Sequence, residues 1–154
     1  MQKCAYCDFY SFGGNENQKN EYTKVLNERV SSSISTLQCK GDTLYFGGGT
    51  PSVLGADNLA ALVNTCKSGF LTDDAEITVE CNPHGLGEDF FKTLYDCGVN
   101  RISMGLQSAV DSERRILGRL SDRNQVENAV KTAQKVGFDN ITLDVMLGIP
   151  NQTE

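Results

Sequence analysis

Two short segments of the chain carry residues that could bind a cofactor. Residues 45–52 read Tyr-Phe-Gly-Gly-Gly-Thr-Pro-Ser after a short apolar run, and Cys4 and Cys7 lie three positions apart near the start. A glycine triplet that leaves a strand lets bare backbone approach a ligand closely. Two cysteines at this spacing can ligate one metal centre. Together the two segments predict a metal centre and a small polar ligand bound side by side.

Each segment alone also fits a simpler interpretation. A lone Cys-x2-Cys pair can be half of a zinc site or a redox pair, and a glycine triplet can be only a tight turn. Four further cysteines stand singly among apolar or element-end positions, and we expect them to be buried or half-buried rather than ligands: Cys39, Cys66, Cys81 and Cys97. This usage is unlike that of a disulfide-rich secreted protein, so we expect a cytoplasmic location.

Strands and helices are predicted to alternate along the chain. Helical periodicity or capping signals occur in five stretches, at 17–37, 57–69, 88–97, 111–117 and 122–137. Short apolar or alternating runs predict four strands, at 43–46, 75–80, 100–104 and 140–147. Asp57, Asp111 and Asp122 are predicted to cap helices at their N-termini, and Gly98 and Gly137 to end them.

Repeated β-α units with short loops imply a parallel sheet with helices outside, as a barrel or as a doubly wound sheet. In both folds the ligand lies at the carboxyl ends of the strands. Polar residues at those ends are residues 47–50, Glu80, Gln107 and Asp144. Their convergence from four successive strands predicts one binding site, with strand-end caps as the simpler alternative for Glu80 and Asp144.

Composition limits the classes of function. A chain of 154 residues is long enough for one domain with a real core, and the apolar share of 39% is ordinary for a globular protein. The net charge of −6 argues against a nucleic-acid surface, so no nucleic-acid partner is expected. No apolar run approaches the roughly 20 residues that span a bilayer.

Six short motifs follow one another along the chain, at residues 4–9, 45–51, 79–83, 100–108, 117–119 and 140–150. In this order they resemble the motifs of the radical S-adenosylmethionine (SAM) superfamily. Within that superfamily the chain is similar to the oxygen-independent coproporphyrinogen III oxidase-like family. The resemblance covers nearly the whole chain and implies a partial (β/α) TIM-type barrel, the radical SAM core, as one incomplete domain at 1–154.

The resemblance implies a [4Fe–4S] cluster. The family motif is Cys-x3-Cys-x2-Cys, and Cys4 and Cys7 match its second and third cysteines, while the first would fall one position before Met1. The family's first strand would also lie upstream, and the chain stops where the family continues into another helix. We therefore expect a fragment, truncated at both ends. In the family, the iron without a protein ligand binds SAM, whose reductive cleavage gives a 5′-deoxyadenosyl radical.

The resemblance also implies how SAM would be held. Tyr6 matches a position beside the adenine, and Gly48, Gly49 and Thr50 match positions that receive the methionine part through backbone groups. Glu80 matches a contact to the ribose or the methionine, because a carboxylate accepts hydrogen bonds from hydroxyl or ammonium donors.

A second SAM molecule is bound by oxidases of the family. Gln107, Arg119 and Asp144 match the positions that hold it, with Arg119 as a bidentate partner for a carboxylate. The simpler alternative for Arg119 is an ion pair on the surface. No residue is assigned as catalytic.

One position separates two branches of the family. The oxidases carry a further cysteine two positions after the third cluster ligand, and here that residue is Phe9. The resemblance therefore favours the heme-chaperone branch, with heme as an additional ligand, over the oxidative decarboxylation of coproporphyrinogen III. It implies heme or a porphyrinogen, an electron donor and respiratory heme acceptors as partners. A radical SAM enzyme acting on RNA or a peptide, and an inert truncated product, are the alternatives from other classes.

Overall fold

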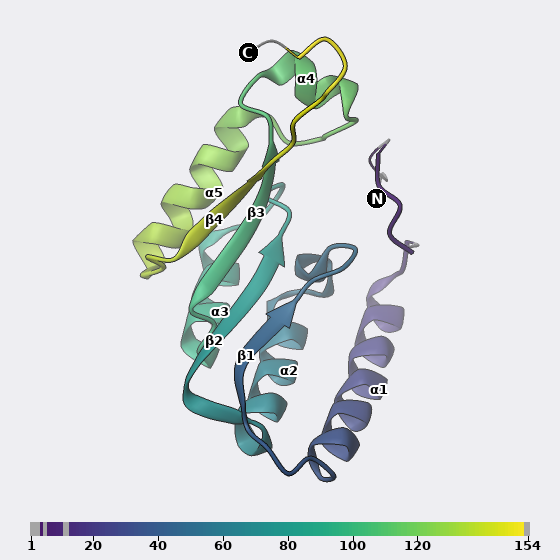
Figure 1. Ribbon diagram of the computed structural model, residues 1–154, viewed down its shortest axis with the longest axis vertical. Coiled ribbons are helices and arrows are strands. Elements are labelled where there is room, and N and C mark those ends of the chain that lie inside the picture. Colours follow the sequence, from purple (N-terminus) through teal and green to yellow (C-terminus); the bar gives the residue numbers. More distant parts are fainter. Residues whose placement is uncertain (1–3, 5, 11–12, 153–154) are drawn as a thin grey trace.

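Four parallel strands form a single sheet in the computed structural model, which describes residues 4, 6–10 and 13–152 (Figure 1). The strands are β1 (Gly41–Phe46), β2 (Leu71–Cys81), β3 (Arg101–Gln107) and β4 (Ile141–Val145). The helices are α1 (Glu16–Ile34), α2 (Ala56–Gly69), α3 (Glu88–Cys97), α4 (Asp111–Ile116) and α5 (Arg123–Val136), with a short 3-10 helix, η1 (Pro51–Leu54).

The strand order follows the order of the chain. β1 pairs with β2, β2 with β3 and β3 with β4, all parallel. A doubly wound sheet reverses its strand order at a switch point, whereas this sheet has no reversal. The predicted α/β class is confirmed. Of the barrel and the doubly wound sheet, the uninterrupted strand order matches part of a barrel.

Helices cover one face of the sheet. α2, α3 and α5 pack against one another on this face, and α1 packs beside α2 (Figure 1). Alternate strand residues point into this layer and form the core, among them Ile77, Val79, Ile102 and Met104, which are at most 4% exposed. The alternation sends the intervening residues to the opposite face, where polar side chains gather.

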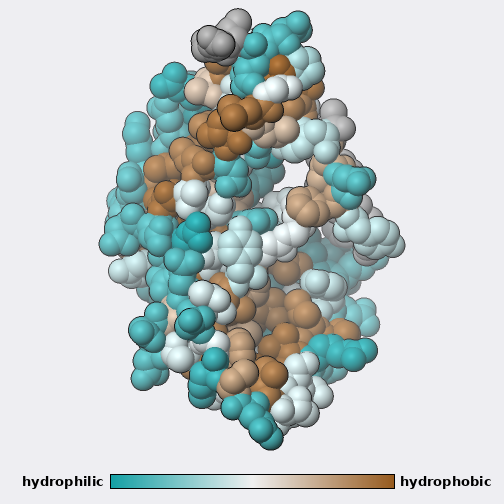
Figure 2. Space-filling view, viewed as in Figure 1, coloured by the Kyte–Doolittle hydropathy of each residue, from teal (hydrophilic) through white to brown (hydrophobic). Residues whose placement is uncertain are grey.

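The opposite face is open in the part of the chain that the structure describes. Figure 2 shows it with hydrophilic and intermediate residues along the middle and an apolar band above them. Exposed apolar side chains occur in β4 and the segment that follows it: Leu143, Val145 and Leu147. None of the described helices is both long enough and apolar enough to cross a membrane.

Helix ends agree with the sequence at three of the predicted caps. Asp122 caps α5 in a reciprocal capping box with Gln125, Gly98 ends α3 in a left-handed conformation with φ 102°, and Gly137 follows α5 with φ 127°. These local signals needed no tertiary contact, because each satisfies backbone groups of its own helix.

Two of the predicted caps are wrong. Gly55 is the N-cap of α2 and Val110 that of α4, so Asp57 and Asp111 lie inside the first turn. Both carboxylates still stabilise their helices, because negative charge near a helix N-terminus interacts favourably with the positive end of the helix dipole.

The cysteine expectations hold with one exception. Cys66 and Cys81 are buried and Cys97 is half-buried, as predicted, but Cys39 is exposed. The reason is its place in the connection between α1 and β1, which runs over the surface.

Candidate functional site

The glycine triplet leaves the carboxyl end of β1 with its backbone open to solvent. Gly48 has φ 111°, a backbone conformation that residues other than glycine rarely adopt. A Cβ built on Gly48 would meet no atom within 4 Å. The hydroxyl of Thr50 donates to the carbonyl oxygen of Gly49 at 2.6 Å, just before η1 begins. The loop therefore offers bare, unobstructed backbone to a ligand.

A carboxylate is held directly beside this loop. Tyr45 of β1 donates from its hydroxyl to Oε1 of Glu80 at 2.8 Å. The hydrogen bond to Glu80 raises the pKa of Tyr45, and burial and the nearby carboxylates of Glu80 and Asp144 act in the same direction. Glu80 thus lies at the end of β2 with one oxygen already engaged.

Asp144 is held from the neighbouring strand. The hydroxyl of Ser103, which is 4% exposed, donates to Oδ1 of Asp144 at 3.1 Å. Glu80 pairs in register with Ser103, and Asp144 pairs with Gly105 two residues further along β3. Glu80 and Asp144 therefore follow one another toward the carboxyl ends on the same face of the sheet.

Gln107 ends β3 in an unusual backbone conformation. Its φ is 66°, in the left-handed region, and its carbonyl accepts from the backbone N–H of Met146 at 2.8 Å. A Cβ built on Gly105 would lie 2.7 Å from the side-chain nitrogen Nε2 of Gln107 and 3.0 Å from Nη2 of Arg119. The Gln107 side chain therefore folds back over Gly105 beside the guanidinium group.

Arg119 connects this strand end to the cysteine segment. Nη2 donates to the carbonyl oxygen of Gly105 at 2.7 Å, and Nη1 lies 3.9 Å from Sγ of Cys4. Its Nε is buried without a hydrogen-bond partner among the described residues. The surface ion pair considered for Arg119 is not what the structure shows, because the described salt bridges do not include it.

The two spaced cysteines lie in one turn. The N–H of Cys7 donates to the carbonyl oxygen of Cys4 at 3.1 Å, and both thiols are free and half-buried. Burial raises the pKa of Tyr6 between them, the neighbouring Cys4 adds to the increase, and the positive charge of Arg119 opposes it. The segment lies toward the carboxyl ends of the strands (Figure 1).

The predicted site residues therefore fall into two groups. The glycine loop, Glu80 and Asp144 form one, linked by Tyr45 and Ser103. Gln107, Arg119 and the cysteine segment, residues 4 and 6–7, form the other, linked through Gly105.

A buried arginine, which no sequence pattern indicated, supports the second group. Arg114 is 1% exposed and donates to the carbonyls of Leu106, Ser108 and Ser121. Burial, followed by the charge of Arg119, lowers the pKa of Arg114. It lies in α4 beside the exposed Arg115, and helical periodicity alone does not distinguish the two. Strand alternation places Tyr45 on the same face of β1 as residue 47 of the glycine loop. This signal could have indicated that Tyr45 lies beside the site.

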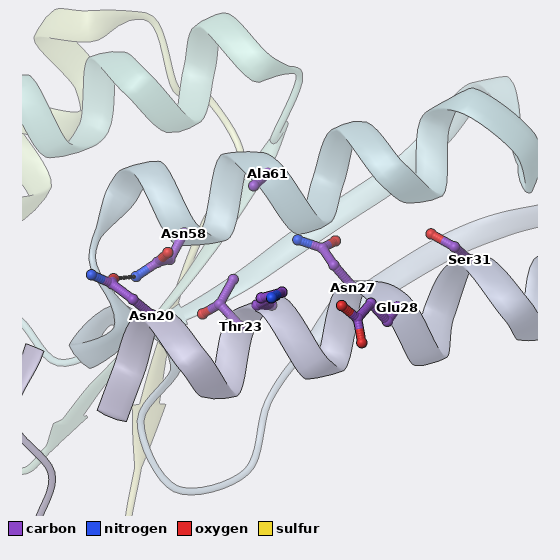
Figure 3. Close-up of a pocket in the computed structure, with 8 residues that line it drawn as sticks. Asn20, Thr23, Asn27, Glu28, Ser31, Asn58 and Ala61 are labelled. Atoms are coloured by element: carbon purple, nitrogen blue, oxygen red, sulfur yellow. Dashed lines mark hydrogen bonds between the residues drawn. The ribbon is translucent and has the colours of Figure 1, made fainter. Parts of the chain in front are cut away.

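A groove lies elsewhere on the molecule. A groove of about 630 Å³ runs between α1 and α2, lined by polar residues that include Asn20, Thr23 and Asn58 (Figure 3). Asn58 donates to Asn20 across it at 2.9 Å. These helices lie outside the sheet, and the groove is lined by none of the predicted site residues, so it is separate from the strand-end site.

The donor set fits an iron–sulfur cluster and a polar cofactor in part. Two half-buried thiols beside a cation suit thiolate ligands, and the open backbone at Gly48 is a cradle that a side chain would narrow. Among the described residues no three His, Cys, Asp or Glu side chains form a metal site. Of the residues that the structure describes, Cys4 and Cys7 are the ones that could supply thiolate ligands to such a centre.

The sheet and the site define an α/β protein of partial-barrel type with a ligand site at the carboxyl ends of its strands. The chain belongs to the Radical SAM superfamily, whose sequence profile matches residues 1–154. This superfamily is built around SAM and a [4Fe–4S] cluster.

Named relatives narrow the comparison. The chain is 35% identical over 160 residues to the heme chaperone HemW of Haemophilus influenzae, covering 99% of this chain and 42% of that protein. It is 38% identical over 152 residues to HemW of Lactococcus lactis, covering 97% and 39%. The solved coproporphyrinogen III oxidase HemN of Escherichia coli superposes with a TM-score of 0.87 at 25% identity, over 99% of this chain and 36% of that one. The chain thus spans about two fifths of the length of its curated relatives.

Proposed function

We propose that the chain is the cofactor-binding part of a heme chaperone. The observation that carries the proposal is the gathering, at one end of the sheet, of two spaced thiols, an open glycine loop and two oriented carboxylates. Relatives named heme chaperones are 35% and 38% identical over nearly all of the chain, which supports the same function here.

In this proposal Cys4 and Cys7 hold two irons of a [4Fe–4S] cluster. When bound, the cluster supplies one-electron reduction of SAM coordinated to its open iron. The guanidinium of Arg119, 3.9 Å from Cys4 Sγ, offsets part of the negative charge that thiolates bring to the turn. Tyr6, half-exposed in the same turn, is assigned to the adenine.

The glycine loop and Glu80 are assigned to the remainder of SAM. Gly48, Gly49 and Thr50 would bind the methionine part through backbone groups, since Gly48 is unobstructed. Glu80 would accept from hydroxyl or ammonium groups of the ligand. Its attachment to Tyr45 fixes the direction from which it does so.

Gln107, Arg119 and Asp144 are assigned to a second SAM molecule. The proximity of Gln107 to Arg119 supports a joint role for these two. Asp144 lies on the same face and is oriented by Ser103, so that it can accept from an ammonium or hydroxyl group.

A second candidate function is the oxidative decarboxylation of coproporphyrinogen III. The close superposition on the solved oxidase favours it, with a TM-score of 0.87. Phe9, 57% exposed, stands where the resemblance places a cysteine in the oxidases, which favours the chaperone. In either case the partners include an electron donor and heme or a porphyrinogen, with respiratory heme acceptors for the chaperone. A cytoplasmic location and the absence of a nucleic-acid partner complete the proposal.

Anaerobic reconstitution of the full-length natural protein separates the candidates. A heme chaperone will give a stable, shifted Soret band on titration with heme, and an oxidase will convert coproporphyrinogen III in the presence of SAM and dithionite. Release of 5′-deoxyadenosine reports cleavage of SAM in either case. A protein that binds neither iron, SAM nor heme would contradict the proposal.

A further inference from the structure

Tyr45 reaches Glu80 diagonally across two strands. In the β1–β2 register Tyr45 pairs with Thr78, and Glu80 lies two residues further toward the carboxyl end of β2. The phenol nevertheless donates to Glu80 Oε1 at 2.8 Å. Residues at such diagonal positions on one face lie within reach of long and aromatic side chains. The Tyr45 side chain therefore holds the Glu80 carboxylate from a position two residues nearer the amino end of the sheet.

Gly47 makes room for this contact. A Cβ built on Gly47 would lie 2.7 Å from the ring atom Cε1 of Tyr45 and 3.1 Å from Oε1 of Glu80. Carbon atoms do not approach a ring this closely, so any side chain at position 47 would displace the ring or the carboxylate. The first glycine of the triplet thus has a separate task from Gly48, whose surroundings are open.

The pair leaves one carboxylate oxygen available. Glu80 Oε1 is engaged by Tyr45, whereas Oε2 accepts no hydrogen bond from any residue that the structure describes. Glu80 is half-buried, and its Oε1 lies 3.1 Å from the position of a Cβ built on Gly47, so the carboxylate adjoins the glycine loop. A carboxylate fixed at one oxygen loses less rotational freedom when the other binds a ligand.

We propose that Tyr45 is a positioning residue for SAM, which fixes Glu80 so that its second oxygen meets the ligand on the glycine loop. The inference rests on the proposed binding of SAM. The hydrogen bond to Glu80 raises the pKa of Tyr45, so the phenol keeps its proton and remains a donor.

The test is SAM affinity, measured by anaerobic equilibrium binding on the reconstituted full-length natural protein. Tyr45→Phe removes the hydroxyl and keeps the ring, and we expect binding about five- to tenfold weaker, with iron content and thermal unfolding unchanged. Tyr22→Phe is the matched control, because Tyr22 is an exposed tyrosine on α1, outside the sheet, and does not take part in the described hydrogen bond to Glu80. It should bind SAM as the wild type does.

A double-mutant cycle separates positioning from general structure. If Tyr45 acts through Glu80, then Tyr45→Phe combined with Glu80→Ala, which removes the acceptor, will bind no more weakly than Glu80→Ala alone. Additive losses, or wild-type affinity in Tyr45→Phe, would overturn the inference and leave the proposed function standing. Failure of the wild-type protein to bind SAM would overturn both.

Discussion

Arg114 holds the carbonyl groups on both sides of Gln107. A single guanidinium nitrogen, Nη1, donates to the carbonyl of Leu106 and, at 3.1 Å, to that of Ser108. Gln107 lies between them with φ 66°, a conformation that persists only where the surroundings enforce it. The buried arginine therefore maintains the strand end that carries Gln107, close to Gly105, whose carbonyl accepts from Arg119.

Replacing Arg114 is expected to loosen this strand end. Arg114→Met leaves several buried carbonyls without a donor, so we expect unfolding to be easier by about 2–4 kcal/mol. Urea denaturation of the full-length natural protein measures the difference. Arg115→Met is the control, because Arg115 is its exposed neighbour in α4, and should change stability little. Equal stability of the two variants would show that Arg114 does not carry this role.

Gln107 can be tested through its backbone. Gln107→Gly removes the strain of a side chain in the left-handed backbone region and should keep or slightly raise stability. It should also lower the affinity for the second SAM molecule, to which Gln107 is assigned. Gln107→Val should destabilise by about 1–3 kcal/mol, because a branched side chain tolerates this conformation poorly. The comparison is again by urea denaturation. Identical stability of the Gly and Val variants would contradict the strained conformation.

Gly48 and Gly13 give a matched test of the glycine loop. Gly48→Ala places a side chain at φ 111° and should weaken SAM binding in the equilibrium assay, with a loss of about 1 kcal/mol in stability. Gly13→Ala also adds a methyl group to open space, but its φ lies outside the left-handed region. It should leave both quantities unchanged. Unaltered SAM affinity in Gly48→Ala would argue against backbone recognition there.

The Cys81 thiol links stability to alkaline pH. Burial, followed by the charge of Glu80, raises the pKa of Cys81 from an ordinary 9.0 to about 12. Since the unfolded chain loses this proton first, its contribution to stability is complete below pH 9 and is lost as the pH rises toward 12. Stability of Cys81→Ala should therefore fall less steeply than that of the wild type between pH 9 and 11.

Cys39 is the control for this pH dependence, because it is exposed. Cys39→Ala should keep the wild-type slope. Urea midpoints measured across the same pH range decide the comparison, and parallel slopes for Cys81→Ala and the wild type would contradict the shift.

The helix limits that could be predicted from the sequence are those that depend on neighbouring residues of the chain. α3 spans the predicted 88–97, and the Asp122 cap and Gly98 stop are where the capping rules place them. β3 instead runs on to Gln107, three residues beyond the prediction, because pairing with β4 through a bulge extends it. That extension depends on a neighbouring strand, which local periodicity does not report.

The site was predictable as a set of positions but not as a set of contacts. Alternation and strand ends indicated Glu80 and Asp144, and both lie on the open face. The hydrogen bonds that orient them come from Tyr45 and Ser103 on adjacent strands, at separations of 35 and 41 residues. Such contacts depend on register, which becomes known only with the sheet.

If a [4Fe–4S] cluster and SAM meet at the carboxyl ends of these strands, electron paramagnetic resonance will detect their contact. The reconstituted, dithionite-reduced full-length protein should show a [4Fe–4S] signal that changes shape when SAM is added. Cys4→Ala and Cys7→Ala should each abolish it, while Cys39→Ala retains it. A wild-type protein without the signal, or one whose signal ignores SAM, would contradict the account.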